Sequence, residues 1–131
     1  MGKAKHDAAV RRKIVIVDDD VLIRETVRLA LDHAGYYVIA VGEPERALAV
    51  VRAEKPDLVI MDLYMPGFDG RDLIRSLKSD PEIAATPVIL FSGSDEAIDV
   101  VSGLQSGAIE YLGKPIDGEV LLRKIRHILK S

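Results

Sequence analysis

The sequence predicts a single α/β domain, a doubly wound five-stranded parallel sheet with helices on both faces. Short apolar runs rich in β-branched residues recur along the chain, and each is followed by a segment whose apolar residues have helical spacing. This alternation favours parallel strands, because each right-handed crossover lays a helix on one face of the sheet. With 131 residues, 48% of them hydrophobic, the chain suffices for one domain with a full core.

Five predicted strands alternate with five predicted helices. The strands cover residues 14–17, 36–41, 58–61, 87–91 and 108–112. The first, second, fourth and fifth helices cover residues 21–34, 44–54, 95–106 and 117–129, and the third helix ends at residues 80–81. Asp20 and Asp69 are placed to cap the first and third helices, since a carboxylate there accepts hydrogen bonds from the first turn. In helix 95–106, Ile98, Val101 and Leu104 form a stripe predicted to face the core.

Composition indicates the boundaries of the domain and excludes several classes of partner and site. Residues 1–12 are predicted to form a flexible N-terminal tail, and residues 13–131 the folded domain. A net charge of -3 with interspersed signs argues against direct nucleic acid binding and against a membrane partner. The absence of cysteine excludes disulfides, thiolate catalysis and Cys-based zinc sites. Because no apolar run reaches membrane-spanning length, a cytoplasmic location is expected.

Polar residues follow four of the predicted strands. Asp18 and Asp19 come after the first strand, Asp62 after the third, Ser92 after the fourth and Lys114 after the fifth. The carboxyl ends of parallel strands share one edge, where open α/β sheets bind ligands, so these side chains are expected to converge. Taken alone, Asp62 is equally consistent with a residue that ends a strand or caps a helix.

Three adjacent carboxylates require a counter-charge, because they cannot all stay ionised without one. One candidate is a hard divalent cation such as Mg²⁺, which takes oxygen ligands and often adds phosphate oxygens. The other is the ammonium of Lys114, which can pair with a carboxylate or a phosphoryl group. With the hydroxyl of Ser92 as a donor, this set suits the binding or transfer of a phosphoryl group.

The motifs at these strand ends resemble one known family. They are Val17–Asp19, Met61–Gly70, Phe91–Gly93, Gly107–Ala108 with Tyr111–Leu112, and Lys114–Pro115. In this order and spacing they resemble the receiver domain of bacterial two-component response regulators, over about residues 13–131. The resemblance implies a flavodoxin-like (βα)5 fold with strand order 2-1-3-4-5.

The resemblance also implies a role for each site residue. Asp62 would accept a phosphoryl group from a histidine kinase or a histidine phosphotransfer protein and form an acyl phosphate. Asp19 and Asp62 would bind Mg²⁺ directly, Asp18 would hold a metal-bound water, and the backbone carbonyl of Tyr64 would complete the metal site. Lys114 would contact the phosphoryl oxygens. The domain would then be a signalling switch that assists only its own phosphoryl transfer and dephosphorylation.

A switch is implied by the same family. Ser92 would move to hydrogen-bond the phosphoryl group, and Tyr111 would turn inward. These movements would change the surface made by the fourth helix, fifth strand and fifth helix, which would control a protein target, an output domain or a phosphorylation-linked homodimer. A cis peptide at Lys114–Pro115 is also implied.

Some positions depart from, or vary within, the family pattern, and rival interpretations remain open. Ser92 stands where threonine is at least as usual, Gly93 where alanine is common, and Tyr64 and Ser94 occupy positions that influence hydrolysis of the acyl phosphate. Tyr111 could instead be an ordinary half-buried strand aromatic. Other candidates are a degenerate receiver, a flavodoxin-like binder of nucleotide or flavin, and an Asp-nucleophile phosphatase, which usually has a second aspartate where this chain has Tyr64.

Overall fold

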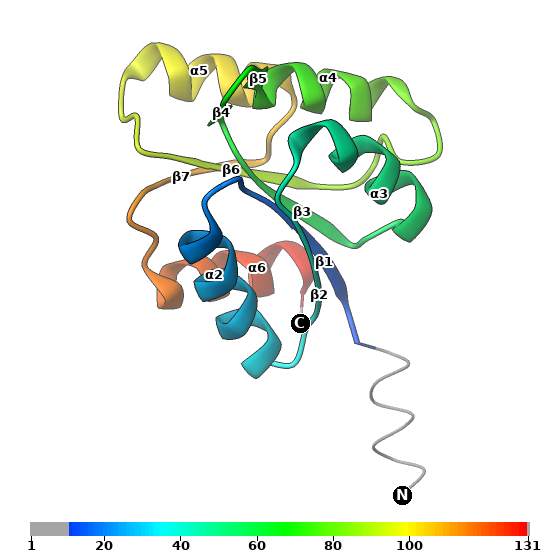
Figure 1. Cartoon of the computed structure of the whole chain (residues 1–131), viewed down its shortest axis with the longest axis vertical. Helices are drawn as coiled ribbons and strands as arrows, with labels where there is room; N and C mark the ends of the chain where they lie inside the picture. Colours follow the sequence, from blue (N-terminus) through cyan, green and yellow to red (C-terminus); the bar gives the residue numbers. More distant parts are fainter. Residues whose placement is uncertain (1–10, 131) are drawn as a thin grey trace, which may run out of the picture.

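The computed structural model describes residues 11–130, which form one five-stranded parallel sheet covered by helices on both faces (Figure 1). Its strands are β1 (Lys13–Val17), β2 (Tyr37–Val41), β3 (Leu58–Asp62), β6 (Val88–Ser92) and β7 (Glu110–Gly113). The order across the sheet is β2-β1-β3-β6-β7, which confirms the expected order 2-1-3-4-5. A short antiparallel hairpin, β4 (Tyr64–Met65) with β5 (Phe68–Asp69), follows β3.

The helices divide between the two faces of the sheet. They are α2 (Val21–His33), the 3₁₀ turn η1 (Pro44–Arg46), α3 (Ala47–Glu54), α4 (Gly70–Ser79), α5 (Ala97–Ser106) and α6 (Gly118–Leu129). In Figure 1, α2 and α6 lie on one face, and α3, α4 and α5 lie on the other. The doubly wound prediction is therefore confirmed.

The core has two halves because successive side chains of each strand point to opposite faces. Ile14 and Ile16 of β1 pack with α2 and α6, whereas Val15 and Val17 pack in the other half with α3 and α4. All four side chains are completely buried, as expected for a parallel strand covered on both faces. This two-sided burial explains why the strands are continuous apolar runs in the sequence.

Both predicted helix caps are present. The carboxylate of Asp20 accepts hydrogen bonds from the backbone N–H groups of Leu22 and Ile23 at the start of α2. Asp69 accepts one from the N–H of Arg71 at the start of α4. These bonds satisfy donors that have no partner within the helix, so they fix where each helix begins.

The predicted orientation of α5 is wrong. Ile98, Val101 and Leu104 are 69%, 49% and 42% exposed, whereas Asp99 and Gly103 of the same helix are buried. The close approach of α5 to the sheet requires a small residue, since a Cβ on Gly103 would lie 2.8 Å from a side-chain carbon of Leu90. The helix therefore packs through its small and polar face and leaves its apolar stripe outward.

Most of the expected N-terminal tail, residues 1–12, precedes the part of the chain that the structure describes. Of the expected tail, residues 1–10 lie outside the described residues. The backbone carbonyl of Arg12 accepts a hydrogen bond from the N–H of Tyr37 (2.9 Å), so the main chain is tied to β2 immediately before β1. Between residues 11 and 130, no helix combines the length and apolarity needed to cross a membrane.

Candidate functional site

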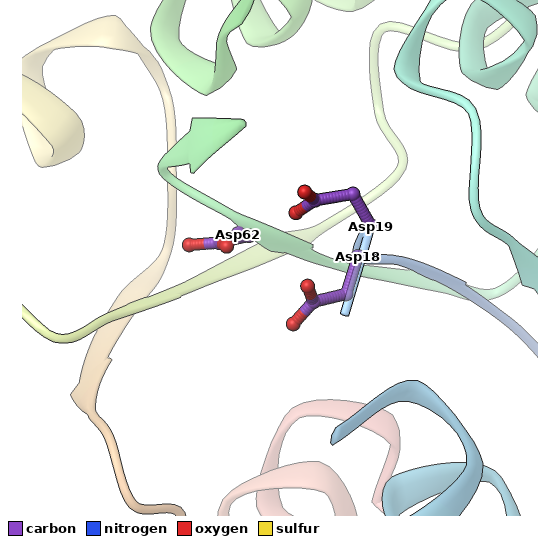
Figure 2. Close-up of side chains that lie close together, drawn as sticks. All are labelled: Asp18, Asp19 and Asp62. Carbon is purple, nitrogen blue, oxygen red and sulfur yellow. The ribbon is translucent and has the colours of Figure 1, made fainter. Parts of the chain in front are cut away.

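Three carboxylates meet at the carboxyl edge of the sheet. Val17 and Met61 are partners in the register of β1 and β3, so the residues that follow them, Asp18 and Asp62, emerge side by side. Asp19 comes next along the chain, and carboxylate oxygens of all three residues lie within 4.8 Å of one another (Figure 2). The expected convergence of the three aspartates is therefore confirmed.

Lys114 brings one ammonium into this group of carboxylates. It follows β7, and its Nζ donates to Oδ2 of Asp62 (3.0 Å) and to Oδ2 of Asp18 (3.2 Å). Its position is held by a backbone hydrogen bond from its N–H to the carbonyl of Ser92 (2.8 Å), and Nζ lies 4.9 Å from the centre of the Phe91 ring. The peptide bond between Lys114 and Pro115 is cis, as the family resemblance implied.

Burial and pairing shift the titration of the central ion pair. Burial raises the pKa of Asp62 above its ordinary value, and the hydrogen bond and charge of Lys114 only partly offset this effect. Burial also acts to lower the pKa of Lys114, but the hydrogen bonds and charges of Asp62 and Asp18 outweigh it, so the pKa of Lys114 is raised. The two carboxylates therefore favour the protonated, cationic form of Lys114.

Asp18 and Asp19 differ in the number of hydrogen bonds that their carboxylates accept from the protein. Asp18 is completely buried, with Oδ1 accepting from the N–H of Asp20 (2.9 Å) and Oδ2 accepting from Lys114. Asp19 is exposed, and within residues 11–130 no donor is hydrogen-bonded to its carboxylate. The oxygens of Asp19 are thus the ones free for a ligand. The donor set, oxygen atoms only, fits a hard cation such as Mg²⁺.

Ser92 and Tyr111, the two residues of the expected switch, are linked through one residue. Ser92 ends β6, is buried, and its Oγ accepts a hydrogen bond from the N–H of Ser94 (3.1 Å). Tyr111 lies on β7, is half-buried, and its hydroxyl donates to the carbonyl of Ser94 (2.9 Å). The loop after β6 therefore stands between the carboxylate site and α5.

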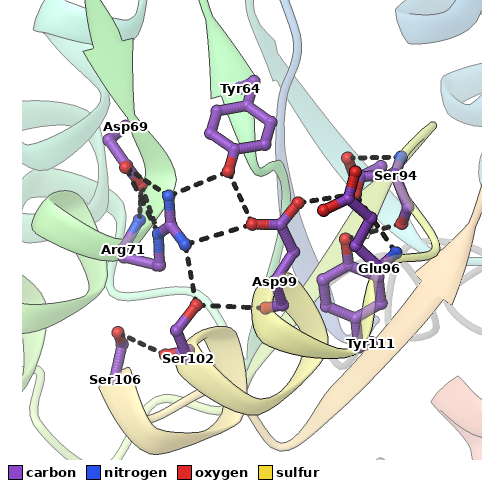
Figure 3. A network of polar contacts seen from close by, with 10 residues as sticks. Tyr64, Asp69, Arg71, Ser94, Glu96, Asp99, Ser102, Ser106 and Tyr111 are labelled. Atoms are coloured by element: carbon purple, nitrogen blue, oxygen red, sulfur yellow. Dashed lines mark hydrogen bonds and ion pairs between the residues drawn. The ribbon is translucent and has the colours of Figure 1, made fainter.

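A polar network beside the site was missed by the sequence analysis (Figure 3). Its centre is Asp99 of α5, which accepts from the hydroxyls of Tyr64 (2.7 Å) and Ser94 (2.5 Å). Arg71 of α4 donates to Asp69, to the hydroxyl of Tyr64 and to Oγ of Ser102. A signal existed, because Asp99, Ser102 and Ser106 have helical spacing as regular as that of the apolar stripe.

An apolar groove of about 250 Å³ opens next to Lys114. Besides Lys114, its lining comes from α2 and from the loop after β7, namely Leu22, Ile23, Thr26, Val27, Pro115 and Ile116. Leu22 is 75% exposed although it is a large apolar residue. The carboxylate site is thus bordered by a surface suited to contact with another molecule.

Comparison with known proteins agrees with this geometry. A family model described as the response regulator receiver domain matches residues 14–126. The transcriptional regulatory protein CseB of Streptomyces coelicolor is 39% identical over 89% of this chain and 49% of its own length. The DNA-binding response regulator MtrA of Mycolicibacterium paratuberculosis is 35% identical over 92% of this chain and 52% of its own.

A solved structure gives the same result for the fold. The chemotaxis protein CheY4 of Vibrio cholerae superimposes with a TM-score of 0.86 at 27% identity, covering 91% of this chain and 99% of CheY4. The chain spans about half the length of the curated relatives it matches. Sequence, fold and arrangement of the strand ends all point to the same assignment, and the chain belongs to the family of response regulator receiver domains.

Proposed function

We propose that this receiver domain accepts a phosphoryl group on Asp62 from a phosphohistidine of a histidine kinase or a histidine phosphotransfer protein. The supporting observation is the pairing of the buried Asp62 carboxylate with Lys114 beside two further carboxylates. A purely phosphorylation-independent interaction module would not need this set of groups. The reaction takes place in the cytoplasm, as part of two-component signalling.

The residues supply what an in-line phosphoryl transfer requires. An oxygen of Asp62 attacks phosphorus, so an O–P bond forms while the P–N bond to the donor histidine breaks, and the imidazole leaves with the electron pair and takes up a proton. Lys114 offsets negative charge on the phosphoryl oxygens, and the Ser92 hydroxyl donates a hydrogen bond to one of them. The chain acts as acceptor in this step and catalyses no turnover of other substrates.

Mg²⁺ bound at the aspartates would supply the remaining positive charge. In this proposal Asp19 and Asp62 would hold the ion directly, together with the backbone carbonyl of Tyr64, and Asp18 would act through a metal-bound water. The open carboxylate of Asp19 and the fully hydrogen-bonded carboxylate of Asp18 support this division.

Incubation with acetyl phosphate, followed by intact-mass measurement, tests the acceptor. The wild type is expected to gain one phosphoryl group only when Mg²⁺ is present, and Asp62→Asn is expected to gain none. Asp72→Asn is the matched control, because Asp72 is an exposed carboxylate on α4 and should leave the adduct unchanged. An adduct in Asp62→Asn would contradict the assignment. Failure of the wild type to bind either phosphate or beryllofluoride would favour the degenerate receiver.

Two surfaces fit the two kinds of partner. The groove beside Lys114 lies next to the acceptor carboxylate, so it is the place where a histidine-bearing donor protein would dock. The exposed apolar stripe of α5 and the neighbouring β7 and α6 form the surface proposed for the downstream target, an output domain or a second copy of the chain.

The downstream surface is tested by substitutions that leave the acceptor intact. Val101→Ser and Tyr111→Ala are each expected to weaken phosphorylation-dependent binding at least about tenfold, since each removes a large side chain from the contact or its support. Analytical ultracentrifugation of the beryllofluoride-bound protein, alone and with its target, measures the effect. Unchanged association in both variants would rule this surface out.

A further inference from the structure

Helix α5 is attached to the domain by a set of polar contacts, besides the close approach of Gly103 to the sheet. We call the hydrogen-bonded set that holds it the α5 clasp, and its members are Tyr64, Arg71, Ser94, Asp99 and Ser102. The buried residues of the helix are Asp99 and Gly103, and its apolar stripe of Ile98, Val101 and Leu104 is exposed. Because polar contacts depend on direction and distance more than apolar packing does, the position of α5 depends on the clasp.

Ser94 joins this clasp to the phosphorylation site. Its N–H donates to Oγ of Ser92, its carbonyl accepts from the hydroxyl of Tyr111, and its own hydroxyl donates to Asp99. Any displacement of the Ser92 hydroxyl therefore acts on Ser94, which is hydrogen-bonded to Tyr111 of β7 and to Asp99 of α5.

We propose that Asp99 is a positioning residue that couples Ser92 to α5 through Ser94, on a route separate from Tyr111. This inference rests on the proposed phosphorylation of Asp62. When the Ser92 hydroxyl turns to donate to a phosphoryl oxygen, the backbone of Ser94 loses its acceptor and the loop shifts. The Ser94 hydroxyl carries that shift to the Asp99 carboxylate, and α5 moves with its outward apolar stripe.

Asp99 is suited to transmit this shift because its carboxylate accepts hydrogen bonds from two sides. One oxygen accepts from the hydroxyl of Ser94 in the loop, and the other accepts from Tyr64 and Arg71. Hydrogen bonds to a carboxylate are roughly twice as strong as neutral ones, so the link between the loop and the helix is a firm one. Tyr64 and Arg71 fix the other side of the carboxylate to β4 and α4.

Hydrogen exchange of the α5 amides, with and without beryllofluoride and Mg²⁺, measures this coupling. In the wild type the analogue is expected to change the exchange rates of residues 97–106. In Ser94→Ala the change should shrink at least about tenfold, the effect of losing one hydrogen bond to a charged group. Asp99→Asn, which keeps the size of the side chain, should shrink it similarly, whereas Gln105→Ala on the exposed side of α5 should preserve it.

The outcomes separate this inference from the function on which it rests. Beryllofluoride binding to Ser94→Ala with the full wild-type change in α5 exchange would overturn the coupling and leave Asp62 as acceptor. Wild-type binding without any change in α5 would do the same. A wild type that does not bind beryllofluoride would instead contradict the proposed function. A merely structural role of Asp99 would raise α5 exchange equally with and without the analogue.

Discussion

Replacing Lys114 with alanine is expected to destabilise the protein by roughly 3–5 kcal/mol above neutral pH without divalent cations, the usual cost of leaving buried charges unpaired. Lys114 donates to both Asp18 and Asp62, and these two carboxylates are buried. Without the ammonium they face each other and Asp19 with no cation in the group. Denaturant unfolding monitored by circular dichroism measures the loss.

The same variant should have a characteristic dependence on pH and metal. Burial already raises the pKa of Asp62, and Lys114 is the group that opposes this effect, so its removal raises the pKa further. A carboxylate whose folded-state pKa exceeds its unfolded value binds protons preferentially in the folded state. The destabilisation should therefore be smallest in acid and grow as pH rises through the folded-state pKa. Millimolar Mg²⁺ should reduce it, because the ion replaces the missing charge.

A surface lysine provides the control for this prediction. Lys124 pairs with Glu110 at 3.5 Å, and both side chains are substantially exposed. Lys124→Ala should cost only about 0.2–1 kcal/mol, with little response to Mg²⁺. Equal losses in Lys114→Ala and Lys124→Ala would show that the central ion pair contributes no more than a surface one, and would contradict the role assigned to it.

The sheet and the carboxylate group could be predicted because they depend on local sequence and on one topological rule. The run before Asp62 is apolar at every position, which is typical of a strand buried on both faces. Once the strands are parallel, Asp18 and Asp62 must share an edge, so no long-range information was needed to bring them together. Lys114 could be placed in the same way, since it follows the strand adjacent to β6.

The orientation of α5 could not be predicted from its own apolar spacing. Ile98, Val101 and Leu104 follow the periodicity of a core-facing stripe, and the same spacing is found on a surface intended for a partner. The orientation of the helix is set by the hydrogen bonds that Asp99 accepts from Tyr64 and Ser94, which come from separate segments. Such tertiary hydrogen bonds leave no periodic pattern that identifies their partners.

Gly70→Ala is expected to lower the rate of phosphoryl acceptance by about a hundredfold, the effect of a misplacement of roughly 1 Å at a reacting group. Gly70 is the first residue of α4, directly after the capping residue Asp69. A Cβ there would lie 2.7 Å from the backbone oxygen of Asp62, 3.1 Å from that of Leu63 and 3.2 Å from the Cα of Leu63. These are main-chain atoms, so the strain must displace the segment that carries Asp62, the proposed acceptor.

The cost in stability should be smaller than the effect on the reaction, about 1–3 kcal/mol for overpacking. Gly118 provides a matched control, because it is likewise the first residue of a helix after a capping aspartate, and its Cβ would meet no atom within 4 Å. Gly118→Ala should leave phosphoryl acceptance unchanged and stabilise the protein by up to about 1 kcal/mol.

Acetyl phosphate kinetics by intact mass, with unfolding curves for both variants, separate the effect on the reaction from the effect on stability. If both variants accepted phosphate at the wild-type rate, the backbone of Asp62 would not need the space that glycine leaves. A deficit restricted to Gly70→Ala would instead show that a residue outside the carboxylate group sets the position of Asp62, the proposed acceptor.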